Sequence, residues 1–398
     1  MKKILIFSHA MELGGAERAL LGLLEAFNLD QYSVDLFLMR HEGPLMEFIP
    51  SGVHVLDEIG SYTALGIPLK SALLSKEFRL GLRRLYGKIK AKNRVKKLQY
   101  PSKNSVALEY SHKYTVSAMP QISPDIEYDL AISFLTPHYF VAEKVRAKKK
   151  IAWIHTDYSN VLVDIESERK MWNRYDNIIS ISDKTTDGFL HCFPELKYKI
   201  CVIENIQPVS LIEQQKKEFN TDQEMPRDSI RLLSVGRFAY AKNFDNIPQI
   251  CKKIRESGLN VKWYLIGYGS DEALIRKKIR EAEMEQFVII LGKKVNPYPY
   301  ICACDLYVQP SRFEGNCVSV REAQMLGKPV VITAYPTSAS QLEDGVDGLI
   351  VPMNNEACAS GIINLLNHPN QLKQMELTCQ KRNYSNTGQV EKLRILME

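Results

Sequence analysis

The sequence predicts an α/β protein of two domains, each built on a parallel β-sheet. The chain has 398 residues, which is longer than a domain with one hydrophobic core usually is. Two domains of about 200 residues each would bury most of their apolar surface. Short apolar runs, of the length of buried strands, alternate with longer charged segments that are typical of amphipathic helices. This alternation recurs in both halves of the chain, as repeated strand–helix–strand units require.

Six apolar runs in the first half are predicted to be strands: residues 4–7, 34–39, 129–135, 151–155, 178–182 and 200–204. Residues 16–27 after the first run are expected to form an amphipathic helix. Ser182 and Asp183, at the end of the fifth run, are expected to cap a helix.

The first residues begin like a signal peptide, but Ser8, His9 and Glu12 interrupt the apolar run. The chain has no stretch of about 18 apolar residues. We therefore expect a protein that is neither exported nor membrane-spanning.

A second strand series is predicted at residues 231–235, 261–266, 288–291, 306–309, 330–333 and 349–351. The polar stretch 207–231 precedes this series, so we place the domains at 1–207 and 208–386. Residues 387–398 are expected to form a helix.

Two glutamates lie eight positions apart, with Glu314 in a loop and Glu322 in the second turn of the helix that the loop opens. A helix N-terminus offers unpaired N–H groups and suits a diphosphate. Glu314 could accept hydrogen bonds from a sugar, and Glu322 from a ribose. Any surface helix can carry two glutamates on a solvated face. Here, however, they follow a strand, and Gly327 and another strand come next, which favours a nucleotide-sugar site.

The pair Glu314 and Glu322 resembles the E-x7-E signature of retaining glycosyltransferases of the GT-B fold, especially glycosyltransferase family 4. Four further segments resemble that family in order and spacing: residues 13–18, 234–243, 265–270 and 343–352. The resemblance implies a GT-B fold, with two Rossmann-like parallel-sheet domains facing across a cleft. The same resemblance implies that the helix at residues 387–398 packs back on the first domain. It also implies a metal-independent, retaining enzyme of the hexosyltransferase type, with no cofactor.

The resemblance also assigns roles to particular residues. Its donor-binding positions are Gly236, Arg237, Lys242, Gly267, Gly315, Asn316, Cys317, Val318 and Glu322. Its catalytic positions are Arg237, Lys242, Glu314 and His155. Arg237 and Lys242 would hold the donor diphosphate and stabilise the charge of the leaving group, with help from the backbone N–H groups of residues 316–318. Glu314 would position the transferring sugar without acting as an obligatory nucleophile.

Gly14, Gly15 and His155 are the residues of the first domain that the resemblance places beside the acceptor or the transferring sugar. The glycines could let the backbone adopt positive φ and approach a ligand, although a plain tight turn is the alternative. They do not form the Gly-x-Gly-x-x-Gly fingerprint, which argues against a nicotinamide or flavin enzyme. A single histidine is often structural, but His155 ends a predicted strand, where parallel sheets place their ligands.

The chain departs from the family pattern at two places. Asn316 and Cys317 stand where many members have Phe and Gly, which changes the sugar pocket and leaves the donor sugar open. Tyr268 stands where a small acidic residue is common in the turn at residues 265–270.

Residues 68–114 form a basic, partly amphipathic insertion with a net charge of about +11. Its basic residues are Lys70, Lys76, Arg79, Arg83, Arg84, Lys88, Lys90, Lys92, Arg94, Lys96, Lys97, Lys103 and Lys113. Such a segment can lie on anionic lipid or contact an anionic acceptor, and a solvated insertion is the alternative. No nucleic-acid partner is expected, because no recognisable binding motif accompanies the charge.

The eight cysteines contain no CxxC pair, which favours reduced thiols in a cytosolic protein. Cys302 and Cys304 have no nearby histidine cluster, so no metal is expected.

The sequence thus predicts transfer of a sugar from a nucleotide-sugar, by default a UDP-sugar, to a saccharide or lipid-linked acceptor in cell-surface polysaccharide biosynthesis. The expected location is cytoplasmic, with a peripheral position on the inner face of the cytoplasmic membrane as a further option. A GT-B sugar-nucleotide epimerase or phosphorylase, and a catalytically silent relative that binds sugar-nucleotides, are the alternatives.

Overall fold

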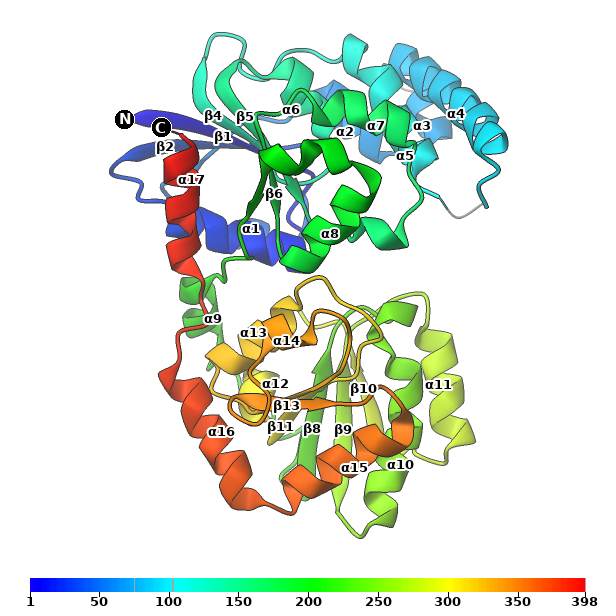
Figure 1. Ribbon diagram of the computed structural model, residues 1–398, viewed down its shortest axis with the longest axis vertical. Helices are drawn as coiled ribbons and strands as arrows, with labels where there is room; N and C mark the ends of the chain where they lie inside the picture. Colours follow the sequence, from blue (N-terminus) through cyan, green and yellow to red (C-terminus); the bar gives the residue numbers. More distant parts are fainter. Residues whose placement is uncertain (75, 102–103, 398) are drawn as a thin grey trace. The chain divides into compact units, whose positions relative to one another are not determined.

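The computed structural model describes residues 1–74, 76–101 and 104–397. It divides into two compact units: unit 1, Met1–Ile206 with Thr387–Glu398, and unit 2, Gln207–Asn386. Each unit holds one parallel sheet with helices around it (Figure 1). The predicted α/β fold with two Rossmann-like parallel-sheet units is therefore confirmed.

The sheet of unit 1 has the strand order β3-β2-β1-β4-β5-β6-β7, and its strands pair in parallel. The strands are β1 (Lys2–Ser8), β2 (Tyr32–Leu38), β3 (His54–Val55), β4 (Tyr128–Ser133), β5 (Ala147–Ile154), β6 (Asn177–Ser180) and β7 (Ile200–Val202). All six predicted strands are present. The sequence missed β3, because a two-residue strand leaves no apolar run, and it started β5 late, because three lysines open that strand.

Eight α-helices accompany this sheet in the described part of residues 1–206: α1 (Gly15–Ala26), α2 (Gly60–Gly66), α3 (Leu69–Leu73), α4 (Phe78–Leu98), α5 (Val106–Thr115), α6 (His138–Lys144), α7 (Ile165–Trp172) and α8 (Asp183–Cys192). Short 3-10 turns lie at Met46–Phe48, Val116–Ala118, Tyr158–Asn160 and Pro194–Lys199. The predicted cap of α8 is confirmed, because the Ser182 hydroxyl accepts a hydrogen bond from the Thr185 N–H at 3.2 Å.

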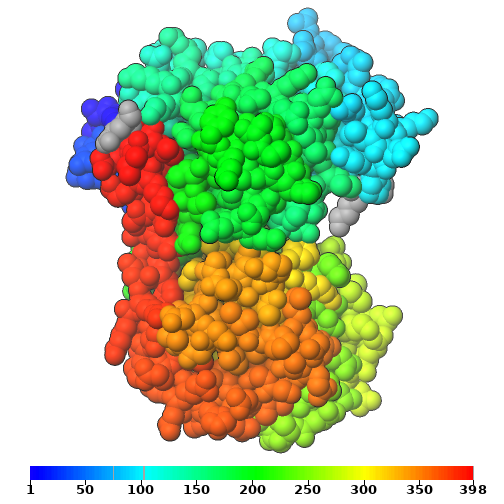
Figure 2. Space-filling view, in the orientation of Figure 1, coloured from blue at the N-terminus to red at the C-terminus, as the bar shows by residue number. Residues whose placement is uncertain are grey.

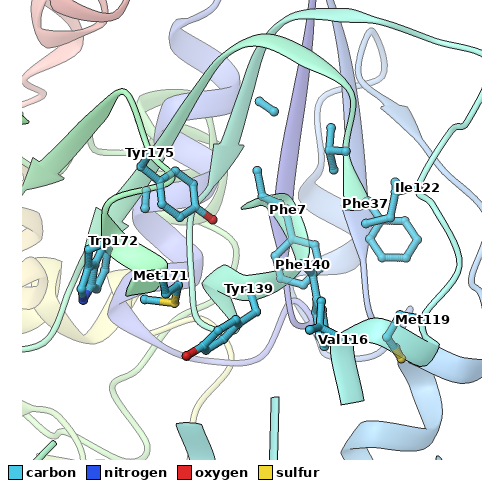
Figure 3. Packing of buried hydrophobic residues seen from close by; sticks show 14 of the residues in the cluster. Phe7, Phe37, Val116, Met119, Ile122, Tyr139, Phe140, Met171, Trp172 and Tyr175 are labelled. Carbon is cyan, nitrogen blue, oxygen red and sulfur yellow. The ribbon is translucent and has the colours of Figure 1, made fainter. Parts of the chain in front are cut away.

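Aromatic side chains dominate the core of unit 1 (Figure 3). Phe7 stacks on Phe37, with 5.9 Å between the ring centroids, and Tyr62 packs edge-on against both Phe37 and Phe140 at 5.1 Å. Such edge-to-face pairs add stability beyond the burial of their area. This core fixes the position of β1, β2 and α6 beneath the loops that follow the strands.

The sheet of unit 2 has the order β10-β9-β8-β11-β12-β13 and is also parallel. Its strands are β8 (Ile230–Val235), β9 (Val261–Ile266), β10 (Val288–Gly292), β11 (Leu306–Gln309), β12 (Val330–Thr333) and β13 (Gly348–Val351). Its helices are α9 (Val209–Gln215), α10 (Ile247–Glu256), α11 (Glu272–Glu281), α12 (Tyr298–Ala303), α13 (Val318–Met325), α14 (Ser338–Gln341), α15 (Asn355–Leu366) and α16 (Pro369–Lys381). All six strands of the second predicted series are present.

The end of the chain belongs to unit 1. After the turn Thr387–Gln389, helix α17 (Val390–Leu396) holds two hydrogen bonds to that unit. Lys392 donates to the carbonyl of Val202 at 2.8 Å, and Lys149 donates to the carbonyl of Leu396 at 2.7 Å. Unit 1 is therefore discontinuous in sequence. No helix in the described residues is both long and apolar enough to cross a membrane.

Three histidines in unit 1 are neutral at physiological pH, namely the buried His112 and His138 and the half-buried His155. Burial lowers the pKa of His112, of His138 and of His155 to about 3 in each case. The Ser133 hydroxyl lies 2.8 Å from His138 Nδ1. A histidine that must stay neutral in the folded state stabilises the fold above pH 6.5, and this contribution is lost as the pH falls toward 3.

We expect His138→Gln to reduce the acid sensitivity of unit 1. Between pH 7 and pH 5, the shift of the His138 pKa from 6.5 to about 3 costs the native protein roughly 2 kcal/mol of unfolding free energy, and the variant escapes this cost. Urea unfolding, followed by the fluorescence of Trp153 and Trp172 in a Trp263→Phe background, measures the difference. Burial raises the pKa of Glu168 to about 7 and so acts in the opposite direction, but equally in both proteins. Equal losses in both proteins would contradict the neutral state of His138.

Candidate functional site

The candidate site of unit 2 lies where two neighbouring strands end. β8 and β11 pair directly, through Leu306 with Leu232 and Tyr307 with Leu233. Because the strands are parallel, the loops that follow them meet at the same edge of the sheet. The N–H of Arg312 donates to the carbonyl of Ala241 at 2.7 Å, which joins the two loops.

An ion pair between Lys242 and Glu314 lies at this junction. Lys242 Nζ is 2.6 Å from Glu314 Oε1, and the two side chains are 19% and 11% exposed. Burial alone would lower the pKa of Lys242, but Cys317 and the Glu314 carboxylate raise it above its ordinary value. Lys242 is therefore a fixed positive charge. The Ser311 hydroxyl donates to the same Glu314 oxygen at 2.6 Å.

A chain of buried polar groups supports Glu314 from the core of the sheet. The Tyr307 hydroxyl donates to Gln309 Oε1, and Gln309 Nε2 donates to the Ser311 hydroxyl, each at 3.0 Å. Ser311 then donates to Glu314. Each donor in this chain polarises the next, and the carboxylate at its end is held in one orientation. The sequence analysis assigned no role to Gln309, although a polar residue at the end of an apolar strand was a usable signal.

Helix α13 begins directly after Cys317, as predicted, and the Cys317 sulfur lies 3.7 Å from Lys242 Nζ. The Cys317 N–H donates to Gln341 Oε1 at 2.7 Å. The N–H groups of residues 316–318 were expected to bind the diphosphate, and the one of Cys317 is occupied by this side chain. Burial and Glu314 raise the pKa of the Cys317 thiol, against the effect of Lys242. The thiol is therefore neutral and adds no negative charge to the site.

Two buried polar atoms near this helix start have no hydrogen-bond partner among the described residues: Asn316 Oδ1 and the Tyr335 hydroxyl. Burial and the nearby Cys317 and Glu314 raise the pKa of Tyr335, so its hydroxyl keeps its proton. An unsatisfied buried polar group costs about 1–3 kcal/mol. The sequence analysis missed Tyr335, which follows β12 at the same edge of the sheet.

Glu322 lies in the second turn of α13, as predicted, but it is 0% exposed. The Tyr298 hydroxyl donates to its Oε1 at 3.0 Å. The sequence indicated the position of Glu322 on the helix correctly. The sequence did not show that α12 covers the side of the helix on which Glu322 lies.

Arg237 follows β8 with an exposed side chain that forms no ion pair with a described residue. Gly236 packs beneath Lys242, because a Cβ there would lie 3.3 Å from Lys242 Cε. A Cβ on Gly267 would lie 1.9 Å from the carbonyl oxygen of Gly236. Gly267 is thus required for the close approach of two loops. Gly315 lies half-buried between Glu314 and Asn316, and Val318 is the first residue of α13.

The candidate residues of unit 1 lie after β1 and β5. Gly14 has an extended φ of −140°, and Gly15 is the first residue of α1, so neither needs the positive φ that the sequence analysis allowed for. A Cβ on Gly14 would instead lie 2.1 Å from the Glu17 carboxylate. His155 follows β5, and its ring stacks on Trp153 at 6.2 Å.

No group of three or more His, Cys, Asp or Glu side chains in the described residues is arranged to hold a metal ion. All eight cysteines are free thiols. Cys304 is buried and donates to the carbonyl of Ile301 at 3.2 Å, whereas Cys302 is partly exposed.

Residues 215–382, which contain the Lys242–Glu314 pair and α13, match a family model described as Glycosyl transferases group 1. The amylovoran biosynthesis glycosyltransferase AmsK of Erwinia amylovora is 26% identical over 142 residues, 34% of this chain and 35% of the relative. An N-acetylgalactosaminyltransferase of Campylobacter jejuni, named for an N,N'-diacetylbacillosaminyl-diphospho-undecaprenol acceptor, is 29% identical over 126 residues, 31% of this chain and 34% of the relative. The chain thus spans about a third of these relatives.

Two solved structures resemble the whole chain in fold. HepE of Anabaena in complex with UDP and glucose has a TM-score of 0.67 at 16% identity, covering 100% of this chain and 99% of that one. A mutant of S. aureus TarM in complex with UDP, fondaparinux and α-GlcNAc-glycerol has a TM-score of 0.68 at 16% identity and covers 100% of both chains. Residues 215–382 are therefore similar to the Glycosyl transferases group 1 family, and the chain as a whole shares the two-sheet fold of HepE and TarM.

Proposed function

We propose that the chain is a retaining, metal-independent glycosyltransferase of family 4. It would be an enzyme of the hexosyltransferase type, which moves a sugar from a UDP-sugar to a saccharide or lipid-linked acceptor in cell-surface polysaccharide biosynthesis. The observation that carries the proposal is the Lys242–Glu314 pair at the N-terminus of α13, within the segment that matches the family model. UDP in the solved structure of HepE and an undecaprenol-linked acceptor in the name of the Campylobacter relative support the choice of substrates.

The proposed reaction breaks the bond between the sugar C1 and the diphosphate and joins C1 to the acceptor hydroxyl oxygen. The hydroxyl proton passes to an oxygen of the leaving diphosphate on the same face. Lys242 and the exposed Arg237 stabilise the charge that grows on the diphosphate, and the start of α13 adds its dipole. Because Lys242 is a fixed positive charge, this stabilisation does not depend on a metal ion.

Glu314 already accepts hydrogen bonds from Lys242 and Ser311, so its carboxylate is oriented before a sugar arrives. In the proposal, it accepts hydrogen bonds from the transferring sugar and stabilises the positive charge that develops at C1. The unpartnered Asn316 Oδ1 and Tyr335 hydroxyl are further groups for the donor. The proposed contact of Glu322 with the ribose requires a local opening, because its side chain has no exposed surface.

Donor binding to unit 2 tests the first step. We expect UDP to raise the melting temperature, and Lys242→Met and Arg237→Ala each to weaken UDP binding about tenfold, since a hydrogen bond to a charged group is worth about 1.5–3 kcal/mol. Thermal shift over a UDP titration measures the change. Arg280→Ala, an exposed arginine on α11, is the control and should bind like the native protein. Equal responses to all nucleoside diphosphates would contradict the choice of UDP.

The products of turnover separate the proposal from its alternatives. With a UDP-sugar and an undecaprenyl-diphosphate-linked saccharide, we expect release of UDP together with an extended saccharide. NMR of the new linkage should show the anomeric configuration of the donor. Isomerised sugar-nucleotide without transfer would indicate an epimerase. Release of a sugar phosphate from a glycan in the presence of inorganic phosphate would indicate a phosphorylase. Tight UDP binding without turnover would indicate a silent relative.

We also propose that unit 1 contacts an anionic membrane through α4, at the inner face of the cytoplasmic membrane. Phe78, Leu82 and Ile89 are 49%, 53% and 52% exposed. With Leu85 between them, their spacings of four, three and four residues place them on one face of the helix. Exposed basic residues lie on both sides of this row: Arg79, Arg83, Lys88, Lys90 and Lys92. Figure 2 shows the light-blue segment that contains α4 at the surface of unit 1.

Some of the basic residues that the sequence analysis counted are not free for this surface. Arg84 donates to the carbonyls of Ala64 and Ile67, and Arg94 pairs with the buried Asp164 at 2.7 Å. Lys103 lies outside the described residues. The remaining exposed charges and the apolar row have the arrangement of a helix that lies in the plane of a membrane surface.

We expect the full chain to sediment with vesicles of phosphatidylglycerol and phosphatidylcholine and not with phosphatidylcholine alone, because each surface Lys or Arg adds about 1 kcal/mol on anionic lipid. The triple variant Phe78→Ser, Leu82→Ser, Ile89→Ser should bind at least tenfold more weakly. Leu274→Ser, which removes a 42% exposed leucine of α11, is the control and should change nothing. If the triple variant bound the anionic vesicles as strongly as the native protein, this result would contradict a role for the apolar face of α4.

A further inference from the structure

Unit 1 contains a cavity of about 150 Å³ at the carboxyl ends of β4 and β5. Helices α5, α6 and α7 and the segment after β5 form its walls. This volume holds several water molecules. The wall includes the carboxyl groups of Glu109 and Glu168 and contains no Lys or Arg. The cavity, called the Glu109 pocket below, lies beside His155 and is not part of the donor site in unit 2.

Three buried polar atoms on the wall of the Glu109 pocket have no partner among the described residues: Glu109 Oε2, Trp153 Nε1 and His155 Nε2. Glu109 is 8% exposed and Trp153 is 2% exposed. Each unsatisfied buried group costs about 1–3 kcal/mol. Three such groups around one cavity indicate that the cavity is filled by polar atoms of water or of a ligand.

The three atoms differ in what they offer. The indole N–H of Trp153 can only donate a hydrogen bond. Glu109 uses its other oxygen to accept from the hydroxyls of Tyr139 and Ser167, which leaves Oε2 as a further acceptor. His155 is neutral, and the backbone of Phe134 bonds to its ring. A neutral ring presents an acceptor on the nitrogen whose partner nitrogen carries the proton.

This mixture of donors and acceptors selects the ligand chemistry. An ammonium group only donates and would leave the Trp153 N–H unsatisfied. A phosphate or carboxylate would lie against Glu109 and Glu168 without any cation on the wall. A hydroxyl both donates and accepts, so a group of neighbouring hydroxyls satisfies all three atoms.

Aromatic side chains form much of the remaining wall of the Glu109 pocket, among them Tyr139, Tyr158 and Trp172. Glu168 accepts hydrogen bonds from the Tyr158 hydroxyl at 2.9 Å and from the Trp172 indole at 3.3 Å, which fixes both rings. In Figure 3 the hydroxyl of Tyr139 points away from the core rings Phe7 and Phe140. Apolar faces with a few placed polar groups are the usual composition of a small-molecule site.

We propose that the Glu109 pocket binds one neutral sugar ring of the saccharide acceptor, with Glu109 and Trp153 as hydrogen-bonding partners of its hydroxyls. Only the identification of this sugar as the acceptor rests on the proposed function. That a neutral pyranose binds there follows from the pocket itself and is tested without turnover.

The test measures binding of methyl pyranosides of glucose, galactose and N-acetylglucosamine to the full chain by saturation-transfer NMR and titration. We expect at least one to bind, with Trp153→Phe and Glu109→Gln each weakening it at least fivefold. Trp153→Phe keeps an aromatic ring and removes only the donor. Trp263→Phe makes the same change in unit 2, where the indole donates to Ser234, and should leave binding unchanged.

Several outcomes would overturn the proposal. They are the absence of binding by all three pyranosides, binding that both variants retain, and stronger binding of choline or inorganic phosphate than of any pyranoside. Near-UV circular dichroism checks the fold, and if Trp153→Phe unfolds, Glu109→Gln alone decides. A UDP thermal shift separates the two proposals: Glu109→Gln should keep the UDP response. A native chain that ignores UDP but binds a pyranoside in a Glu109-dependent manner would count against the proposed function and support the pocket.

Discussion

The parallel direction of every strand pair in the two sheets is the constraint on which the candidate sites depend. In a parallel sheet, every connection must return to the starting edge, so the segments that follow the strands collect at the opposite edge. In unit 2 this brings Lys242, after β8, to Glu314, after β11, although 72 residues separate them in sequence. In unit 1 it brings the ends of β4 and β5 to one cavity. The chemistry of each unit therefore lies at one edge of its sheet.

The strands were largely predictable, because burial on both faces of a parallel sheet leaves continuous apolar runs. β9, β11 and β12 have the predicted bounds, whereas β3 and the lysine-rich start of β5 carry no such signal. In the site, spacing placed Glu322 correctly in the second turn of α13. It could not show that Tyr298 covers the carboxylate or that Gln341 occupies the Cys317 N–H, because those contacts come from segments distant in sequence.

The ionisable side chains at the candidate sites of unit 1 and unit 2 differ in how they are stabilised. In unit 2, Lys242 pairs directly with Glu314, and the pKa of the lysine is raised above its ordinary value. In unit 1, the wall of the Glu109 pocket contains no Lys or Arg, and burial keeps the rings of His138 and His155 neutral. The first arrangement suits a charged diphosphate, and the second suits uncharged hydroxyl groups.

The return of the chain to unit 1 has a consequence for its synthesis. Domains fold as units while the chain emerges from the ribosome, N-terminal parts first. Unit 2 is continuous in sequence, whereas unit 1 receives α17 only after all of unit 2 has been made. The hydrogen bonds from Lys392 to Val202 and from Lys149 to Leu396 therefore form only after unit 2 has been made. Completion of the first unit is thereby tied to the prior synthesis of the second.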